Sequence, residues 1–249
     1  MVELPQDLDG AIAQARTATI AAIADGYCLL QVELVFPELK AQPIAEQFLS
    51  VWEAIGSPPK VLFPDAGAAA LARRDWGDVP FAISDIGTRS RSIKTRLSPD
   101  DPWFVAIEPS AVEVAQIEQL SNFAGDRPVV LLLPRLEDIT TIGIGYAARQ
   151  LRERFLNRIE SCYYIQPLDG ATLFRCYPSP WQVWRETEEG TQEMIWETPT
   201  KPVGDELERI LSGEADADAT SDSGDDRPKP PKKAGFLTEI QRFLNALNQ

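Results

Sequence analysis

The sequence contains no histidine, so any chemistry would have to use carboxylates, Lys, Tyr or Cys, and candidate carboxylates occur at the ends of predicted strands. Glu108, Glu137 and Asp138 follow predicted strands, where paired carboxylates can act as acid and base or hold a metal ion. Without histidine there is no Ser-His-Asp or Cys-His relay and no HExxH zinc site. No ligand motif accompanies these acids, so we interpret them as surface caps and expect no catalytic residue, no metal and no cofactor.

A second candidate is the turn at residues 63–67 (FPDAG), which follows a predicted strand and opens a predicted helix. Doubly wound folds bind ligands at this kind of position. The turn lacks the GxGxxG pattern, and no GxxxxGK[ST] loop occurs anywhere in the chain. Asp65 would also repel a phosphate, so a helix-capping role is favoured for Asp65 over a ligand loop.

Basic residues gather between Arg73 and Arg96, although the whole chain has a net charge of −14. That charge repels nucleic-acid backbones and anionic lipid, so we expect no nucleic-acid binding. Arg89, Arg91, Lys94 and Arg96 form the one stretch where an anion or an acidic partner could dock. The alternative, which we favour, is a solvated loop whose basic residues pair with acids of the same protein.

The C-terminal part of the chain changes character twice. Residues 212–226 are acidic and almost without large apolar side chains, and residues 227–234 are rich in proline and lysine. Residues 212–234 are therefore predicted to be a disordered linker, because they cannot bury enough surface to offset the entropy of ordering. Residues 235–249 are predicted to form an amphipathic helix. Its apolar stripe consists of Phe236, Leu237, Ile240, Phe243, Leu244 and Leu247.

This stripe is the strongest functional signal in the sequence. An isolated helix of this length is marginal in water, so the stripe must gain its order from a contact. The contact could be a groove on a partner protein, a groove on the chain's own folded domain, or a membrane interface. An acidic linker is repelled from anionic lipid, so a protein groove is favoured, and membrane contact is expected to be peripheral at most.

Upstream of the linker, helices and strands alternate. Helices are predicted at residues 7–25, 43–55, 66–73, 110–123, 144–159 and 204–211. Strands are predicted at residues 27–36, 61–63, 81–86, 103–107 and 129–133, and then at 162–167, 172–177, 181–186 and 193–198. The pattern predicts one α/β domain at residues 1–211. Its sheet should be mostly parallel and doubly wound, with an antiparallel, aromatic-rich meander at the C-terminal end of the domain.

Within this domain, residues 129–133 (VVLLL) should form a central strand that is covered on both faces. Six aromatic residues of the meander are interpreted as core and cross-strand pairs, namely Tyr163, Tyr164, Tyr177, Trp181, Trp184 and Trp196. Cys28, Cys162 and Cys176 lie in apolar runs and are expected to be buried free thiols. No signal sequence or membrane span is recognisable, so we expect a cytoplasmic protein.

Six segments occur in order along the chain: LPQDLDGAIAQA, VELVFPEL, VLFPDAGAAALA, DDPWFVAIEPS, GDRPVVLLLPRLED and FRCYPSPWQVWRE. Together they resemble a family of cyanobacterial and chloroplast proteins. It is a domain-of-unknown-function family that includes the photosystem II assembly factor called low photosystem II accumulation 3. The resemblance runs from Leu4 to about Glu186. The family has no established catalytic residues, so none is carried over to this chain.

The resemblance implies an accessory role in the assembly of photosynthetic complexes at the thylakoid surface, and the lack of a transit peptide favours a cyanobacterial member. We therefore expect a non-enzymatic protein that binds a protein partner, such as a photosystem subunit or another assembly factor. The same domain is fused to an adenylate kinase in plants. This fusion keeps a second hypothesis open, in which the domain binds a small molecule such as a nucleotide or a phosphate.

Overall fold

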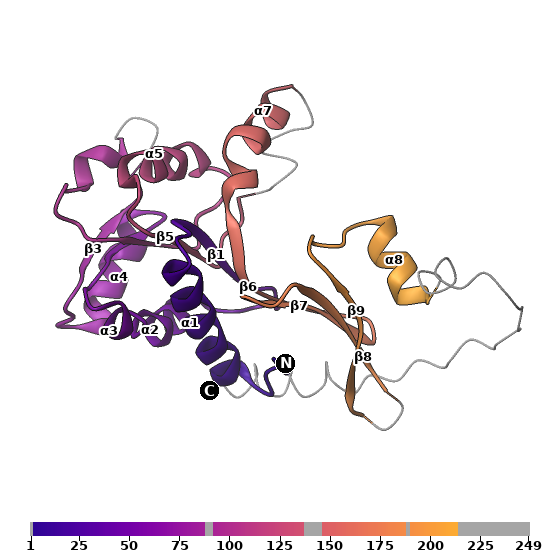
Figure 1. Ribbon diagram of the computed structural model, residues 1–249. Coiled ribbons are helices and arrows are strands. Elements are labelled where there is room, and N and C mark those ends of the chain that lie inside the picture. Colours follow the sequence, from indigo (N-terminus) through magenta and orange to yellow (C-terminus); the bar gives the residue numbers. More distant parts are fainter. Residues whose placement is uncertain (1, 88–91, 137–145, 188–189, 214–249) are drawn as a thin grey trace, which may run out of the picture.

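A computed structural model describes residues 2–87, 92–136, 146–187 and 190–213 of the chain. The strands in this part form one sheet with the order β3-β2-β4-β5-β1-β6-β7-β8-β9 (Figure 1). The parallel strands are β1 (Leu29–Leu34), β2 (Lys60–Phe63), β3 (Ala82–Asp85), β4 (Phe104–Ile107), β5 (Val129–Leu132) and β6 (Glu160–Leu168). The antiparallel strands are β7 (Ala171–Cys176), β8 (Trp181–Glu186) and β9 (Gln192–Thr198). The predicted fold class is confirmed.

Helices cover both faces of the parallel part of the sheet, as Figure 1 shows. One face carries α1 (Leu8–Ala24), α2 (Ala41–Leu49), α3 (Trp52–Ile55) and α4 (Ala66–Trp76). The other face carries α5 (Val114–Ala124), α7 (Tyr146–Arg154) and the 3-10 turns η1 (Ile93–Arg96) and η2 (Leu156–Arg158). Strand β5 lies between these layers with every residue buried, which confirms the predicted central strand for residues 129–132, whereas Leu133 is half-buried and lies beyond the end of the strand. No described helix is both long enough and apolar enough to cross a membrane.

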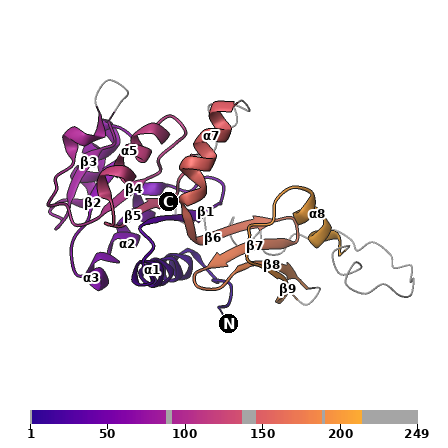
Figure 2. The ribbon, with the colours of Figure 1, turned by 45° about the horizontal axis from the view of Figure 1, so that its top comes forward.

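The last three strands and α8 (Asp205–Ser212) extend away from the helix-covered body (Figures 1 and 2). We call β7, β8, β9 and α8 the wing. Aromatic rings join the wing to β6, with the Tyr164 and Trp181 centroids 5.1 Å apart and the Tyr163 and Phe174 centroids 5.8 Å apart. Helix α8 closes one face of the wing by packing Ile210 against the same cluster as Tyr164 and Trp181. The wing is thus a continuation of the same sheet, with α8 packed on one of its faces.

Several predicted boundaries were wrong, each for a local reason. The helix expected at residues 43–55 is two helices, because the Ser50 hydroxyl donates to the Gln47 carbonyl oxygen at 2.8 Å and competes with the helical ladder. The helix expected from residue 110 begins only at Val114. Residues 110–113 instead form a turn, in which the Glu113 carboxylate accepts from the Ser110 backbone N–H at 3.0 Å. Cys28 is half-buried rather than buried, and all three cysteines are free.

Candidate functional site

The carboxyl ends of the parallel strands are the usual ligand site of a doubly wound fold. At this edge Glu108 follows β4 with φ of 49° and Leu133 follows β5 with φ of 54°. Both are non-glycine residues in the left-handed region, which costs about 1–3 kcal/mol each. The two loops then run side by side, since the Arg135 backbone N–H donates to the Pro109 carbonyl oxygen at 2.8 Å. Arg135 also forms an exposed ion pair with Glu108 at 2.9 Å, so the Glu108 carboxylate has a partner within the protein.

The other acids described at this edge are also engaged within the protein. Asp65 accepts from the backbone N–H groups of Gly67 at 2.7 Å and Ala68 at 2.9 Å, which confirms its predicted role as the cap of α4. Asp85, at the end of β3, forms an ion pair with Arg96 at 2.8 Å. The side chains of Asp85 and Arg96 are both less than one-fifth exposed. Among the described residues no group of acids and cysteines is arranged to hold a metal ion.

The predicted basic stretch is partly described. Arg96 is engaged by Asp85, whereas Lys94 on η1 is exposed. Upstream, the Arg73 guanidinium donates to the Ile83 carbonyl oxygen at 2.7 Å. Arg74 forms an exposed ion pair with Asp75 at 2.7 Å, which lowers the pKa of that carboxyl. The arginines described here therefore have partners within the protein.

Some predicted site residues lie outside the described residues. They are Arg89 and Arg91 of the basic stretch, Glu137 and Asp138, and the whole C-terminal stripe of Phe236, Leu237, Ile240, Phe243, Leu244 and Leu247. The predicted linker and C-terminal helix lie outside them too, except for the first residues after the domain. The last described element is α8, which ends at Ser212.

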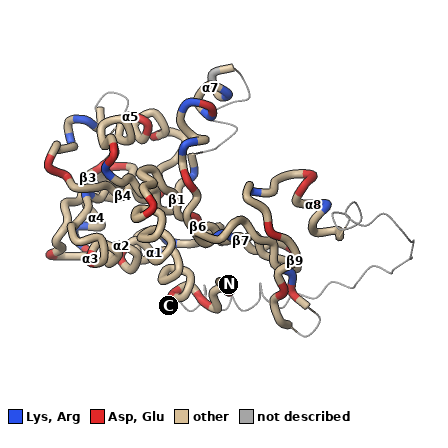
Figure 3. Tube along the Cα trace, viewed as in Figure 1, with Lys and Arg blue, Asp and Glu red and all other residues tan. Residues whose placement is uncertain are grey.

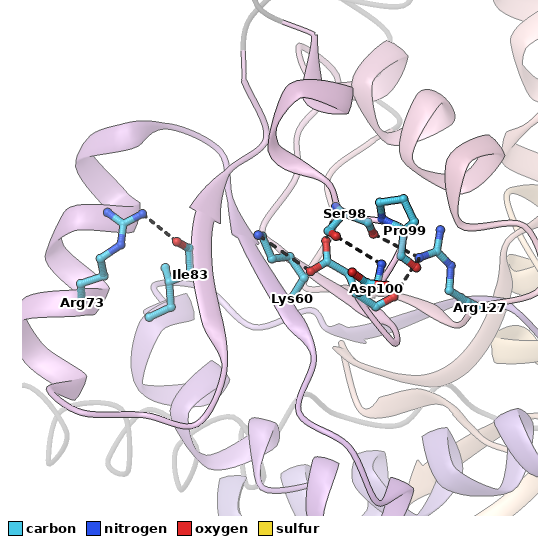
Figure 4. A network of polar contacts seen from close by, with 8 residues as sticks. Lys60, Arg73, Ile83, Ser98, Pro99, Asp100 and Arg127 are labelled. Atoms are coloured by element: carbon cyan, nitrogen blue, oxygen red, sulfur yellow. Dashed lines mark hydrogen bonds and ion pairs between the residues drawn. The ribbon is translucent and has the colours of Figure 1, made fainter.

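The structure contains an arginine clamp that motif analysis of the sequence missed (Figure 4). The Arg127 guanidinium donates to carbonyl oxygens of five residues, at distances between 2.8 and 3.3 Å. These residues are Ser98, Pro99, Asp101, Phe123 and Ala124. The guanidinium also lies over the rings of Phe104 and Phe123, about 5 Å from each centroid. Arg127 thus ties the loop before β4 to the end of α5. Arg127 lies at the amino ends of the strands, away from the carboxyl edge where ligands usually bind, so its role is structural.

A polar network lies on the face of β1 and β6 that α8 shares. The Glu33 carboxylate accepts from the Gln31 side-chain N–H at 2.8 Å and from the Ser161 hydroxyl at 3.3 Å. The Tyr164 hydroxyl donates to Gln166 at 2.5 Å, and burial, with a smaller contribution from Glu33, raises the pKa of Tyr164. Arg175 forms an ion pair with Glu160. These groups satisfy one another, so the network describes a rigid sheet face rather than a reactive centre.

The buried thiols are poor nucleophiles. Burial raises the pKa of Cys162 to about 12 and the pKa of Cys176 to about 11. A thiol with such a pKa stays protonated at neutral pH, and the thiolate is the reactive form. These two cysteines therefore contribute to packing rather than to covalent chemistry.

The two edges of the sheet differ in how they are protected. Strand β3 is four residues long, and Arg73 already occupies the carbonyl of Ile83 (Figure 4). Strand β9 is seven residues long and lies at the other end of the strand order, with no described strand on its outer side. Its Glu193 and Glu197 are exposed, and the side chains between them are half-buried. The outer side of β9, which we call the β9 edge, is the candidate interaction site.

The wing that carries this edge is part of a recognised family domain. Residues 5–209 match the sequence model of a family described as "Domain of unknown function (DUF1995)". The match begins just before α1 and ends within α8, so it includes the whole described sheet. The chain therefore belongs to the DUF1995 family of domains of unknown function.

Proposed function

We propose that this chain is a non-enzymatic accessory protein that binds a protein partner in the assembly of photosynthetic complexes. The partner is a photosystem subunit or another assembly factor, bound through the β9 edge and through the tethered residues 235–249. Contact with the thylakoid membrane is peripheral. The resemblance of the sequence to a family that includes an assembly factor supports a role in the assembly of photosynthetic complexes. The β9 edge of the domain supports binding of a partner strand.

The observation that carries this proposal is the β9 edge at the end of the wing, along which the described residues place no further strand. An edge strand presents a row of N–H and C=O groups that can pair with an extended segment of another chain. Glu193 and Glu197 lie exposed along this edge, and α8 beside it begins with Asp205, Glu206 and Glu208 (Figure 3). An acidic edge of this kind discourages pairing with a second copy of itself and favours a basic partner strand.

The hypothesis of a nucleotide or phosphate ligand has weaker support. At the carboxyl edge of the strands, the described acids Asp65, Asp85 and Glu108 are each engaged by groups of the protein itself. The overall charge of −14 also opposes an anionic ligand. A thermal-shift screen with nucleotides and phosphorylated metabolites tests this alternative. A ligand at 100 times its Kd would stabilise the fold by about 2.7 kcal/mol, which is readily measured.

The proposal is tested by affinity purification of the tagged full-length chain from cyanobacterial cells. In the β9 variant, Glu193 and Glu197 are replaced by Lys. The control variant carries the same charge change away from the wing, at the exposed Glu46 of α2 and Glu53 of α3. We expect recovery of photosystem II subunits to fall about tenfold with the β9 variant, a loss of about 1.4 kcal/mol in binding free energy, and to stay near wild type with the control. Equal recovery with both variants would contradict binding at the β9 edge.

A further inference from the structure

Helix α7 and the η2 turn after it carry a group of arginines that have no ion-pair partner among the described residues. They are Arg149 and Arg152 of α7 and Arg158 of η2, which we call the α7 patch. Arg149 and Arg158 are exposed, and Arg152 is half-buried. By contrast, Arg154 of the same helix forms an ion pair with Glu118 at 2.7 Å. The patch stands out along α7 in Figure 3, because the whole chain has a net charge of −14.

The helical period places Arg149 and Arg152 on the side of α7 that faces away from α5. Leu151 packs against the apolar cluster under the helix. At 3.6 residues per turn, Arg154 lies on one flank of Leu151, and Arg152 and Arg149 lie on the other. Arg154 reaches Glu118 of α5, so the other flank faces away from α5. Figure 2 shows α7 between α5 and α8, so this flank faces the side of α8.

Helix α8 lies on the same face of the sheet as α7 (Figures 1 and 2). Leu29 of β1 belongs to the cluster that α7 covers, and Glu33 points to the same face four residues later. Glu33 lies opposite Tyr164, which packs in the cluster that α8 closes. The described chain therefore ends, at Gly213, on the face that carries the α7 patch.

The residues that follow Gly213 have the opposite charge. Residues 214–226 contain no cation. Their acids are Glu214, Asp216, Asp218, Asp222, Asp225 and Asp226. We propose that residues 214–226, which we call the acidic linker, bind the α7 patch of the same chain. Carboxylates and guanidinium groups form strong, charge-assisted hydrogen bonds, so the chemistry of the two segments is complementary.

The length of the acidic linker suits this contact. From β1, under α7, to β8, under α8, the sheet advances by three strand spacings, about 14 Å. A flexible chain as long as residues 214–226 has an average end-to-end distance of about 20 Å. Such a tether gives an effective concentration in the millimolar range, so a contact with a Kd of about 1 mM would form about half of the time. Single exposed ion pairs are weak, and the contact therefore needs several carboxylates on several guanidinium groups.

Other anionic occupants have a disadvantage that the acidic linker does not have. A nucleic acid or a membrane of anionic lipid is repelled by the net charge of −14. An acidic segment of a partner protein has matching chemistry, but it must displace a linker that is already tethered nearby. The contact forms in the free chain and so goes beyond the proposed function. It holds the start of the tethered residues 235–249 beside α7.

A spin label on the acidic linker tests this contact in the full-length chain without any partner. The label is attached at Ser221→Cys in a Cys28→Ser background, because the remaining Cys162 and Cys176 are buried. The measurement is the paramagnetic relaxation enhancement of the backbone amides of α7. We expect a strong enhancement at low salt and a loss of most of it at 1 M NaCl, where the Debye length is only about 3 Å.

Two variants with the same change of net charge show whether the α7 patch is the binding site. The α7 variant carries Arg149→Glu and Arg152→Glu. The control variant carries Lys40→Glu before α2 and Arg74→Glu in α4, both exposed and on the opposite face of the sheet. We expect the enhancement at α7 to fall about fivefold in the α7 variant and to stay at the wild-type level in the control.

An exchange of charges makes the test independent of any damage to α7. A linker variant with Asp216→Lys, Asp218→Lys and Asp222→Lys should lose the enhancement, and its combination with the α7 variant should regain it. A misfolded α7 could not give this rescue. Equal enhancement in the α7 variant and the control would overturn the proposal, and so would a failure of the rescue.

Two further outcomes would assign the α7 patch to another occupant and overturn the proposal. Enhancement between a spin-labelled chain and a separate, isotope-labelled chain would place the linker of a second copy on the patch. Enhancement that arises only after Glu137→Gln and Asp138→Asn would show that these acids hold the arginines. Every measurement uses the chain alone, so failure here is distinguishable from failure of partner binding at the β9 edge.

Discussion

At the scale of single residues, Asp65 and Arg127 mark the range of what local sequence can reveal. Asp65 caps α4 by accepting from Gly67 and Ala68, which are two and three residues away. Arg127 donates to carbonyl oxygens at residues 98–101, up to 29 residues away. The cap was predictable because its partners are adjacent and its side-chain type is characteristic. The clamp was not, since its acceptors are backbone groups that the fold alone brings together.

Replacing Arg127 with Ala should lower the free energy of unfolding by about 3 kcal/mol, because several carbonyls would lose a charged donor. Replacement with Lys should recover little of this loss, since an ammonium cannot reproduce the planar fork or lie flat on Phe104 and Phe123. Urea unfolding followed by circular dichroism measures both changes. Arg154→Ala serves as the control, because its ion pair with Glu118 is exposed. An Arg127→Ala midpoint equal to the control's would show that the clamp is dispensable.

At the scale of elements, periodicity identified the strands and helices, but not their ends or their order. Strand β5 was predictable because nothing polar interrupts residues 129–132, and it ends where Leu133 adopts a positive φ. The position of β1 between β5 and β6 follows from pairing between segments about 100 residues or more apart, which no local pattern encodes. The candidate β9 edge depends on this order, so its strand could be predicted and its exposure could not.

The buried state of β5 gives a direct test of the sheet. Leu131 is fully buried between the two helical layers, so Leu131→Asp would place an unpaired charge in the core. We expect this variant to lose cooperative unfolding and to accumulate as insoluble protein. Leu131→Ile keeps the volume and should cost less than about 1.5 kcal/mol. A soluble Leu131→Asp variant with a cooperative thermal transition would be incompatible with a central β5.

At the scale of the whole molecule, most of the described arginines of this acidic chain bind acceptor groups of the same protein. Arg73, Arg96, Arg127 and Arg175 each bind a carboxylate or a carbonyl of the same protein. These contacts join elements that are distant in the sheet or fix the loops between them. Such pairing removes cations from the surface, and Lys94 is an exposed exception within the basic stretch. The basic stretch therefore contains residues of two kinds, which substitutions can separate.

Arg96→Glu should destabilise the domain, whereas Lys94→Glu should not. A carboxylate at position 96 would face Asp85, whose side chain is 17% exposed, so we expect a loss of about 2 kcal/mol and a Tm lower by roughly 4–8 °C. Lys94 is exposed, so Lys94→Glu should leave Tm unchanged. If the stretch binds an anionic surface, this second variant should also elute from a heparin column at lower salt than the wild type. Salt screens the attraction between exposed cations and the anionic heparin, so a protein with fewer exposed cations is released at a lower salt concentration. If both proteins eluted at the same salt concentration, the basic stretch would not bind an anionic surface, and the interpretation as a loop that pairs with acids of the same protein would stand. Equal Tm values for the Arg96→Glu and Lys94→Glu variants would contradict the structural role of the Asp85–Arg96 pair.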